Sequence, residues 1–261
     1  WSEKDILVTL SKVRYQQGRL LGKMSVLGFS LKEETVLSTL TLDVLKSSEI
    51  EGESLNYEQV RSSIARKLGI EYAGMVYSNR DVEGVVEMML DATQNYNNPI
   101  DDERLFGWHA ALFPTGRSGM YKIDVGCYRT GEMQIVSGAM GKEKVHYEAP
   151  SSDKVKSEMD AFLEWINTDT TTDPVLKSAI AHFWFIIIHP FDDGNGRIAR
   201  AISDLMLARS DETSQRFYSL SNQILLEKKV YYETLKRVQH SSGDITEWLD
   251  WFLNCLYRSL L

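Results

Sequence analysis

The sequence has almost no cysteine and no long run of apolar residues. Cys127 and Cys255 lie far apart without the spacing of metal ligands, which favours a reducing compartment, although one disulfide between them stays possible. The longest apolar run, FWFIII, is far shorter than the roughly 20 residues of a membrane-spanning helix. No stretch resembles a signal peptide, and the chain starts at Trp1 without a methionine, so a preceding piece stays possible. These absences predict a cytoplasmic protein without membrane contacts.

Basic residues are also too few for a nucleic-acid-binding surface. The net charge is −8 and no long basic run compensates for it, so we expect no nucleic-acid partner. The length of 261 residues allows one large domain or two small ones, and the content of hydrophobic residues, 43%, is that of an ordinary globular protein. Any anion site must therefore be built locally, from a few arginines and backbone N–H groups.

Hydrophobic spacing in the first 70 residues predicts three helices. DILVTLSKVRYQQGRLLGKM and SLKEETVLSTLTLDVLKSSEIEGE both repeat apolar residues at helical intervals. Ser30 is expected to cap the second helix, because Glu33 follows three residues later as in a capping box. Asn56 with Gln59 indicates the start of the third helix.

Strand-forming sequence is scarce in the rest of the chain. A helix over 80–98 is expected to end near NYNNP, which is typical of a linker. MQIV and KVHYE, on either side of Gly138 and Gly141, predict a β-hairpin, and helices are expected from Pro150 onward. The fold class is therefore mainly α with one β-hairpin, with an N-terminal helical domain over 1–95 and a second domain over 96–261.

One segment, IIIHPFDDGNGRIAR at 186–200, places a dense polar turn after isoleucines. It has three explanations: a solvated loop, a metal site, or a cradle for phosphates. Asp173 is a good N-cap and Pro174 suits the first position of a buried helix, which Pro190 is expected to end near His189. A second helix is predicted from about Asn195, so the segment forms a tight turn between two helices.

The N-terminus of this second helix favours the phosphate cradle. Its unpaired N–H groups and positive partial charge attract anions, and Arg197 and Arg200 lie three residues apart on one face. One carboxylate beside such a cradle can hold Mg²⁺ between phosphates. His189 is placed for proton transfer near neutral pH. The segment therefore indicates transfer of a phosphate-containing group.

The same segment resembles the signature of Fic-family enzymes, His-x-Phe-x-Asp/Glu-Gly-Asn-Gly-Arg-x-x-Arg. All eight defined positions agree: His189, Phe191, Asp193, Gly194, Asn195, Gly196, Arg197 and Arg200. The resemblance covers residues 96–261 and implies a Fic-type helical core with the hairpin as its flap. The N-terminal part is similar to the helical domain that precedes the Fic core in some bacterial members.

The resemblance implies a protein adenylyltransferase. His189 would deprotonate a hydroxyl group of a target protein, which would attack the α-phosphate of ATP. Asp193 would hold Mg²⁺ on the α- and β-phosphates, and Gly194, Asn195 and Gly196 would line the anion hole. Arg197 would contact the β-phosphate and Arg200 the γ-phosphate. The family also tends to line the adenine pocket where Tyr231 and Tyr232 lie, although two tyrosines are equally ordinary core residues.

A second segment, SSEIEGE at 47–53, resembles the Fic inhibitory motif, Ser/Thr-x-x-x-Glu-Gly/Asn. Ser47, Glu51 and Gly52 supply its defined positions. Ser47 and Glu51 also continue the apolar stripe of Leu37, Leu40 and Val44, so we expect Glu51 to be buried and to need a partner. The resemblance implies that this partner is Arg200 and that Glu51 takes the place of the γ-phosphate. Alternatively, Glu51 is an ordinary last-turn glutamate.

The remaining expectations concern partners and histidines. A target protein would dock by strand addition at the 133–148 hairpin, with self-modification expected and a homo-oligomer possible. His109 and His182 are interpreted as core histidines and Phe191 as the anchor of the loop.

Three other functions compete with AMP transfer. The first is removal of AMP from a modified protein, which would use the same residues. The second is transfer from a different nucleotide-type or phosphodiester-linked donor, against which the intact Arg197 and Arg200 count. The third is a nonenzymatic nucleotide sensor, against which His189 counts, because binding alone needs no base.

Overall fold

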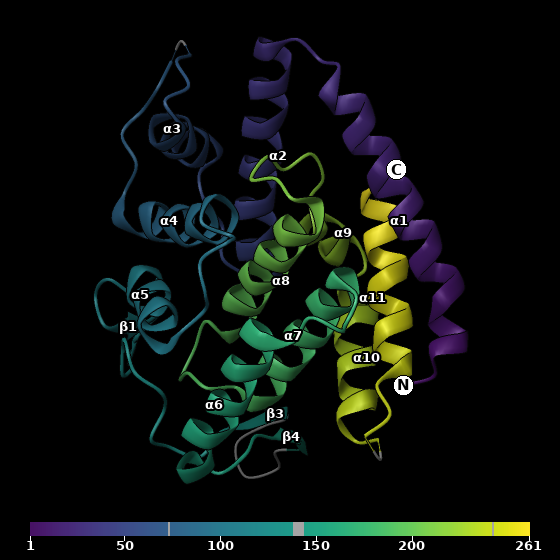
Figure 1. Cartoon of the computed structure of the whole chain (residues 1–261). Helices are drawn as coiled ribbons and strands as arrows, with labels where there is room; N and C mark the ends of the chain where they lie inside the picture. The colour runs from purple at the N-terminus through teal and green to yellow at the C-terminus, as the bar shows by residue number, and fades with distance from the viewer. Residues whose placement is uncertain (73, 138–143, 242) are drawn as a thin grey trace.

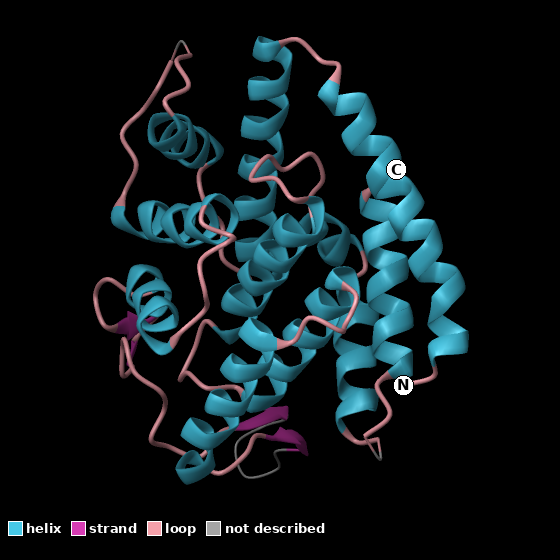
Figure 2. Cartoon of the chain, viewed as in Figure 1, coloured by secondary structure: helices cyan, strands magenta, loops and turns pink. Residues whose placement is uncertain are grey.

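The computed structural model describes residues 1–72, 74–137, 144–241 and 243–261. This described part is mainly helical, with two small two-stranded sheets (Figures 1 and 2). The helices are α1 (Glu3–Ser25), α2 (Phe29–Ile50), α3 (Tyr57–Leu68), α4 (Arg80–Gln94), α5 (Asp102–Leu112), α6 (Ser152–Thr168), α7 (Pro174–Ile188), α8 (Asn195–Asp211), α9 (Leu220–Leu226), α10 (Lys228–Gln239) and α11 (Thr246–Ser259). The expected fold class, mainly α, is confirmed.

Helix α7 forms the centre of the molecule together with α8. The two helices pack against each other more extensively than any other pair in the described chain. Nearly the whole circumference of α7 is buried, because apolar residues occupy all its sides. The N-terminal helices cover this centre: α1 packs along α11, α2 packs on α9, and α4 packs on α8 (Figure 1). One continuous hydrophobic cluster runs through both predicted domains, and the boundary at residue 95 stays a prediction.

Local signals placed several helix ends correctly. The Asn56 side chain accepts a hydrogen bond from the N–H of Gln59 at the start of α3. Asp173 caps α7 with Pro174 as its first residue, and α7 ends before His189. The capping box at Ser30 was wrong, because α2 begins at Phe29 with Gly28 as its N-cap and no side-chain cap. The helix expected over 80–98 ends at Gln94.

The predicted hairpin is present as strands β3 (Gln134–Ser137) and β4 (Lys144–Glu148), which pair antiparallel. A register shift between Ile135 and Val136 introduces an irregularity of the β-bulge type. The expected turn glycines, Gly138 and Gly141, lie outside the described residues. A second pair of short strands, β1 (Arg117–Ser118) and β2 (Tyr121–Lys122), was not foreseen from the sequence.

A buried ion cluster joins the C-terminal end of α8 to the segment that follows it. The Arg216 guanidinium donates to Asp204 and Asp211, at 3.1 Å each, and all three side chains are 1% exposed. Asp211 also accepts hydrogen bonds from Tyr218 and from Gln17 of α1. Burial, together with nearby Asp43, raises the pKa of Asp204 well above its ordinary value. The cluster thus ties α1 to α8 through desolvated charges.

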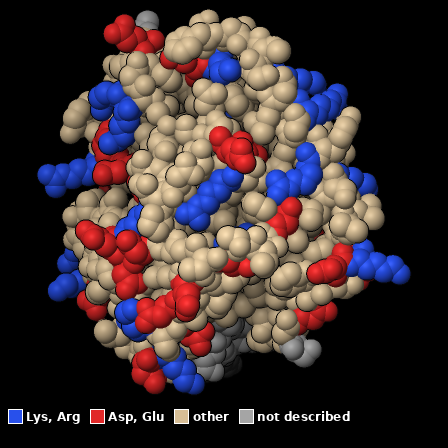
Figure 3. Space-filling model, in the orientation of Figure 1, with Lys and Arg blue, Asp and Glu red and all other residues tan. Residues whose placement is uncertain are grey.

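The surface and the cysteines agree with the composition. Acidic and basic side chains are interspersed on the face shown in Figure 3, without one basic patch among its described residues. Cys127 is exposed and Cys255 is buried, and both are free thiols, so they form no disulfide. Within the described chain, none of the helices is long and apolar enough to cross a bilayer.

Candidate active site

The loop between α7 and α8 is held rigidly by its own residues. The Asn195 side chain accepts from the N–H of Phe191 at 3.0 Å and donates to the carbonyl oxygen of Phe191 at 2.8 Å. The Phe191 ring is fully buried and stacks on His109 with ring centroids 4.3 Å apart. Phe191 and His109 are therefore core residues, as interpreted from the sequence. Since the Asn195 amide closes the loop, a phosphate could meet only its backbone N–H.

His189 terminates α7 in a left-handed conformation, with φ of 50°. Its Nδ1 lies 3.2 Å from the carbonyl oxygen of Ile186, and a carbonyl oxygen only accepts hydrogen bonds. Nδ1 therefore carries the proton, and Nε2 keeps a lone pair that can accept one. Burial lowers the pKa of His189 below its ordinary value of 6.5, so the ring is neutral at neutral pH.

Arg129 binds the carbonyl groups around His189, a role that no sequence pattern indicates. Its guanidinium donates to the carbonyl oxygens of His189 at 2.8 Å, of Gly131 at 2.8 Å and of Pro150 at 2.5 Å. Its backbone N–H also donates to Pro190 at 2.8 Å. Gly131 and Pro150 flank the β3–β4 hairpin, so one buried side chain connects the base of the hairpin to the histidine loop.

The N-terminus of α8 is narrow, and its glycines are closely packed. Gly194 is the N-cap with φ of 80°, and a Cβ atom there would lie 2.9 Å from the ring of Phe113. A Cβ atom at Gly196 would lie 2.1 Å from Oε1 of Glu51. A carboxylate already lies against this helix end, where the unpaired N–H groups and the helix dipole favour negative charge.

The two arginines of the segment are both buried. Arg200 donates to the hydroxyl oxygen of Ser47 at 2.9 Å, to its carbonyl oxygen at 2.8 Å, and to Glu51 at 2.8 Å. Arg197 donates to Glu53 at 2.6 Å, and its guanidinium lies 5.0 Å from the ring centre of Phe113. One nitrogen of each guanidinium, Nε of Arg197 and Nη1 of Arg200, has no hydrogen-bond partner among the described residues. Buried donors without acceptors are costly, and they mark a place that further oxygen atoms would fill.

Glu51 lies just beyond the end of α2 rather than within it. The N–H of Gly52 bonds to the carbonyl oxygen of Glu49 and the N–H of Glu53 to that of Ser48, which is the hydrogen-bond pattern of a Schellman motif. Gly52 has φ of 85°, a conformation that favours glycine. The expectation that Glu51 is buried was wrong: its side chain is 30% exposed, because the turn leaves the buried stripe after Ser47. The contact with Arg200 is present.

Asp193 is the candidate ligand for magnesium. Its carboxylate accepts hydrogen bonds from the N–H of Gly194 and from the hydroxyl of Ser118, and it forms no ion pair within the described chain. In that same part of the chain, no three acidic, histidine or cysteine side chains form a metal cluster. A single carboxylate fits Mg²⁺ that is held mainly by substrate phosphates and water. The residues present therefore fit the expected ion only together with a nucleotide.

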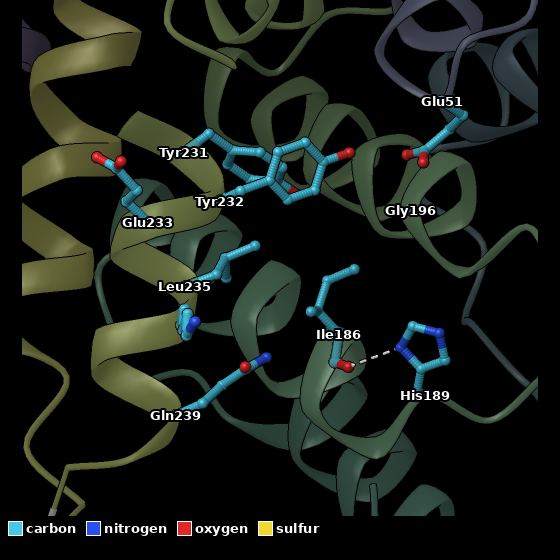
Figure 4. A pocket seen from close by; sticks show the side chains of 10 residues that line it. Glu51, Ile186, His189, Gly196, Tyr231, Tyr232, Glu233, Leu235 and Gln239 are labelled. Atoms are coloured by element: carbon cyan, nitrogen blue, oxygen red, sulfur yellow. Dashed lines mark hydrogen bonds between the residues drawn. The ribbon is translucent and has the colours of Figure 1, made fainter. Parts of the chain in front are cut away.

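A cavity of about 420 Å³ opens beside these groups (Figure 4). Side chains of α10 form one wall, and Glu51 and His189 lie across from them. Tyr231 is buried and Tyr232 is 42% exposed, and both line the cavity. The size and the mostly apolar lining suit a small aromatic ligand with a polar end.

His182 lies beneath this wall and is a satisfied core histidine. Its Nδ1 pairs with the hydroxyl of Ser203, which donates its own proton to Ala199, so Nδ1 carries the histidine proton. Its Nε2 therefore accepts from the hydroxyl of Tyr231 at 2.9 Å. Tyr231 thus has a packing role as well as a place in the cavity wall.

The structure brings most of the sequence-predicted site residues together. His189, Gly196, Tyr231, Tyr232 and Glu51 line one cavity, with Arg200 behind Glu51. Asp193 and Arg197 lie toward a second cavity, of about 440 Å³, whose lining includes Arg197, Glu53 and Ser118. Sequence reasoning missed Arg129, Phe113, Ser118 and Glu53. Only Glu53 had a signal, as the second acidic residue of the EGE triplet.

Two family profiles match the chain. Residues 99–207 match the Fic/DOC family, and residues 1–70 match a domain of unknown function, DUF4172. Among curated proteins, the chain is 23% identical over 231 residues to the protein adenylyltransferase Fic of Nematostella vectensis, covering 83% of this chain and 47% of that protein. It is 39% identical over 62 residues to protein adenylyltransferase fic-1 of Caenorhabditis elegans, covering 23% of this chain and 12% of that protein.

A solved structure shares the fold. The crystal structure of a Fic family protein from Desulfovibrio desulfuricans G20 superimposes with a TM-score of 0.71 at 24% identity, covering 100% of this chain and 74% of that one. The chain spans less than half the length of the curated relatives that it matches. The similarity to the Fic/DOC family thus lies in residues 99–207 of this chain, and the fold of the solved Fic protein covers the whole chain.

Proposed function

We propose that the chain transfers AMP from ATP to a hydroxyl side chain of a target protein. The observation that carries this proposal is the base at His189, whose Nε2 lone pair borders a nucleotide-sized cavity, next to two buried arginines with unfilled donors. The names of the relatives, protein adenylyltransferases, support the same reaction class.

In the proposed reaction, Nε2 of His189 accepts the proton of the target hydroxyl. The hydroxyl oxygen bonds to the α-phosphorus, and the bond between that phosphorus and the bridging oxygen to the β-phosphate breaks, releasing pyrophosphate. Arg197 and Arg200 would hold the β- and γ-phosphates. Mg²⁺, held by Asp193, would neutralise phosphate charge. The N–H groups of Gly194, Asn195 and Gly196 would bind phosphate oxygens.

We further propose that the structure is the inhibited state. The Glu51 carboxylate pairs with Arg200 and lies against Gly196, at the helix end that a phosphate would need. A γ-phosphate cannot share this space with a carboxylate of the same charge. Glu51 must therefore leave Arg200 before ATP binds productively.

The experiment is transfer of radioactive phosphorus to protein from ATP labelled at either the α or the γ position, with Mg²⁺. Wild type, Glu51→Gly and Glu51→Gly/His189→Ala are compared, each alone and with cell lysate. We expect label only from the α position, strong in the single variant and absent in the double. Label from the γ position would contradict AMP transfer. Equal label in wild type and Glu51→Gly would contradict the inhibition.

Removal of AMP from a modified protein is a second candidate. Both phosphate-binding arginines are paired with glutamates while the cavity between His189 and α10 is open, which suits a ligand with a single phosphate. The matching test is loss of label from an AMP-modified protein. Loss in wild type that disappears in Glu51→Gly would favour removal over transfer, and no loss would eliminate it.

The target would dock on the hairpin. In the described part of the sheet, β3 pairs only with β4, so an extended segment could add to the sheet as a third strand. Self-modification, a homo-oligomer and a cytoplasmic location stay predictions, as does transfer from another nucleotide-type donor.

A further inference from the structure

Glu53 forms an ion pair with Arg197, just as Glu51 forms one with Arg200. Oε2 of Glu53 accepts a hydrogen bond from Nη1 of Arg197 at 2.6 Å. It is the one carboxylate that contacts Arg197 among the described residues, and Arg197 itself is only 3% exposed. The inhibitory motif defines no residue at this position, so the resemblance did not predict this contact.

The turn after α2 directs both carboxylates to the same helix. The N–H of Glu53 bonds to the carbonyl oxygen of Ser48 at 3.0 Å, which fixes the backbone of Glu53 two residues beyond Glu51. Arg197 and Arg200 lie three residues apart on one face of α8. The turn thus lets each glutamate pair with one of the two arginines.

The surroundings of Glu53 show that its ion pair is exchangeable. Its side chain is 45% exposed and borders the cavity of about 440 Å³, which gives the carboxylate room to turn away from Arg197. Burial, with the nearby carboxylates of Asp193, Glu51 and Asp81, raises its pKa despite the opposing effect of Arg197. The local field therefore disfavours the charged form that the ion pair requires.

We propose that Glu53 is a second phosphate-mimicking residue, which excludes the β-phosphate from Arg197 and so makes the site select nucleotides by their number of phosphates. This inference rests on the proposed function, in which Arg197 binds the β-phosphate and Arg200 the γ-phosphate. AMP reaches neither arginine, ADP reaches only Arg197, and ATP reaches both. Glu51 would then oppose ATP alone, whereas Glu53 would oppose ADP and ATP.

The experiment measures the binding of AMP, ADP and ATP by calorimetry, with Mg²⁺, to five forms of the full chain. These are wild type, Glu51→Gln, Glu53→Gln, the double variant and Asp81→Asn. Asp81 is the matched control, because it lines the same cavity as Glu53 without an ion pair to Arg197. Glutamine preserves the size of both side chains, and the partial exposure of Glu51 and Glu53 makes the variants compatible with folding.

We expect Glu53→Gln to raise the affinity for ADP about fivefold, which is the factor expected when one partly exposed carboxylate no longer competes for Arg197. The affinity for ATP should rise in Glu51→Gln and in Glu53→Gln, and further in the double variant. The affinity for AMP should be the same in every form. An unchanged ADP affinity in Glu53→Gln would overturn the inference. Equal tightening of AMP, or the same effect in Asp81→Asn, would also overturn it, by showing a general charge effect.

The outcomes separate this inference from the function on which it rests. If no form binds any of the nucleotides, the proposed function fails and the inference fails with it. If ATP binds, and binds more tightly to Glu51→Gln, but the affinity for ADP is the same in Glu53→Gln as in wild type, only the role of Glu53 fails.

Discussion

Two clusters of buried arginine lie at opposite ends of α8, and they differ in their carboxylate partners. At the C-terminal end, Arg216 pairs with Asp204 and Asp211, which are as fully buried as the arginine. At the N-terminal end, Arg197 and Arg200 are equally buried, but Glu53 and Glu51 are 45% and 30% exposed. In the C-terminal cluster both the arginine and its carboxylates are shielded from water. In the N-terminal cluster only the arginines are.

This difference separates a structural ion cluster from a candidate binding site. A fully buried carboxylate cannot leave its arginine without remaining unpaired in a medium of low polarity. A carboxylate at the surface can turn toward water at small cost, and an incoming anion can then replace it. Among the buried arginines of α8 and the segment after it, only those at the N-terminal end are thus suited to exchange partners.

Two histidines of the α7 region repeat the contrast. Both ring nitrogens of His182 are hydrogen-bonded within the core. Among the described residues, His189, seven positions later, forms a hydrogen bond only through Nδ1, and it borders the cavity. Removal of a fixed group should therefore cost more stability than removal of an exchangeable one.

The largest effect is expected for Arg216→Ala. It would leave Asp204 and Asp211 buried without their cation, so we expect the free energy of unfolding to fall by about 3–5 kcal/mol. Arg197→Ala should lose less than half as much, because Glu53 can turn toward water. Urea unfolding followed by circular dichroism measures both. Equal losses would remove the distinction between the two clusters.

A smaller effect is expected from His182 as the pH falls. Burial lowers its pKa from 6.5 to about 3, so between these pH values the imidazole is protonated in the unfolded chain and neutral in the folded chain. The contribution of the neutral imidazole to the free energy of unfolding is fully present above pH 6.5 and is lost as the pH falls below that value. Between pH 7 and pH 5, wild type should lose about 2 kcal/mol more unfolding free energy than His182→Asn.

The control for this measurement is His240→Gln, which changes an exposed histidine. Comparison with this variant separates the effect of the buried imidazole from that of removing any histidine. If His182→Asn follows wild type, burial of this imidazole has no effect on acid stability.

The smallest effect is expected for Gly52→Ala. Nothing lies within 4 Å of the added methyl group, so the cost comes only from the left-handed backbone, about 1 kcal/mol. Gly18→Ala makes the same chemical change in the middle of α1, also in open space, and should stabilise the protein by about 0.5–1 kcal/mol. Thermal unfolding shows whether each substitution raises or lowers the stability. Stabilisation by both changes would mean that the turn after α2 does not require glycine.

Interactions close in sequence were predictable, and those between distant segments mostly were not. Asn56, Asp173 and the end of α7 at His189 follow from neighbouring residues, because capping is decided within one helical turn. The prediction at Ser30 was wrong for the same reason: a capping box describes a local preference, and α2 starts earlier, at Phe29, with Gly28 as its N-cap. The contact of Glu51 with Arg200 was expected only because a resemblance supplied the distant partner.

Glu53 and Arg129 show what the sequence alone does not contain. Glu53 meets Arg197 across 144 residues, and Arg129 binds the carbonyl oxygen of His189 across 60. A backbone carbonyl carries no sequence signal, so nothing in the pattern around His189 indicates that an arginine holds it. Strands as short as β1 and β2 leave too few residues for a period of two to be recognised.

The turn that follows α2 makes the two glutamate contacts depend on the length of one helix. An α-helix rotates by about 100° for each residue, so one residue inserted between Ser47 and Glu51 would carry both carboxylates away from α8 together. One deleted residue would do the same in the opposite direction. Related chains could therefore gain or lose both contacts by a single insertion or deletion, with every residue of the α7–α8 loop unchanged.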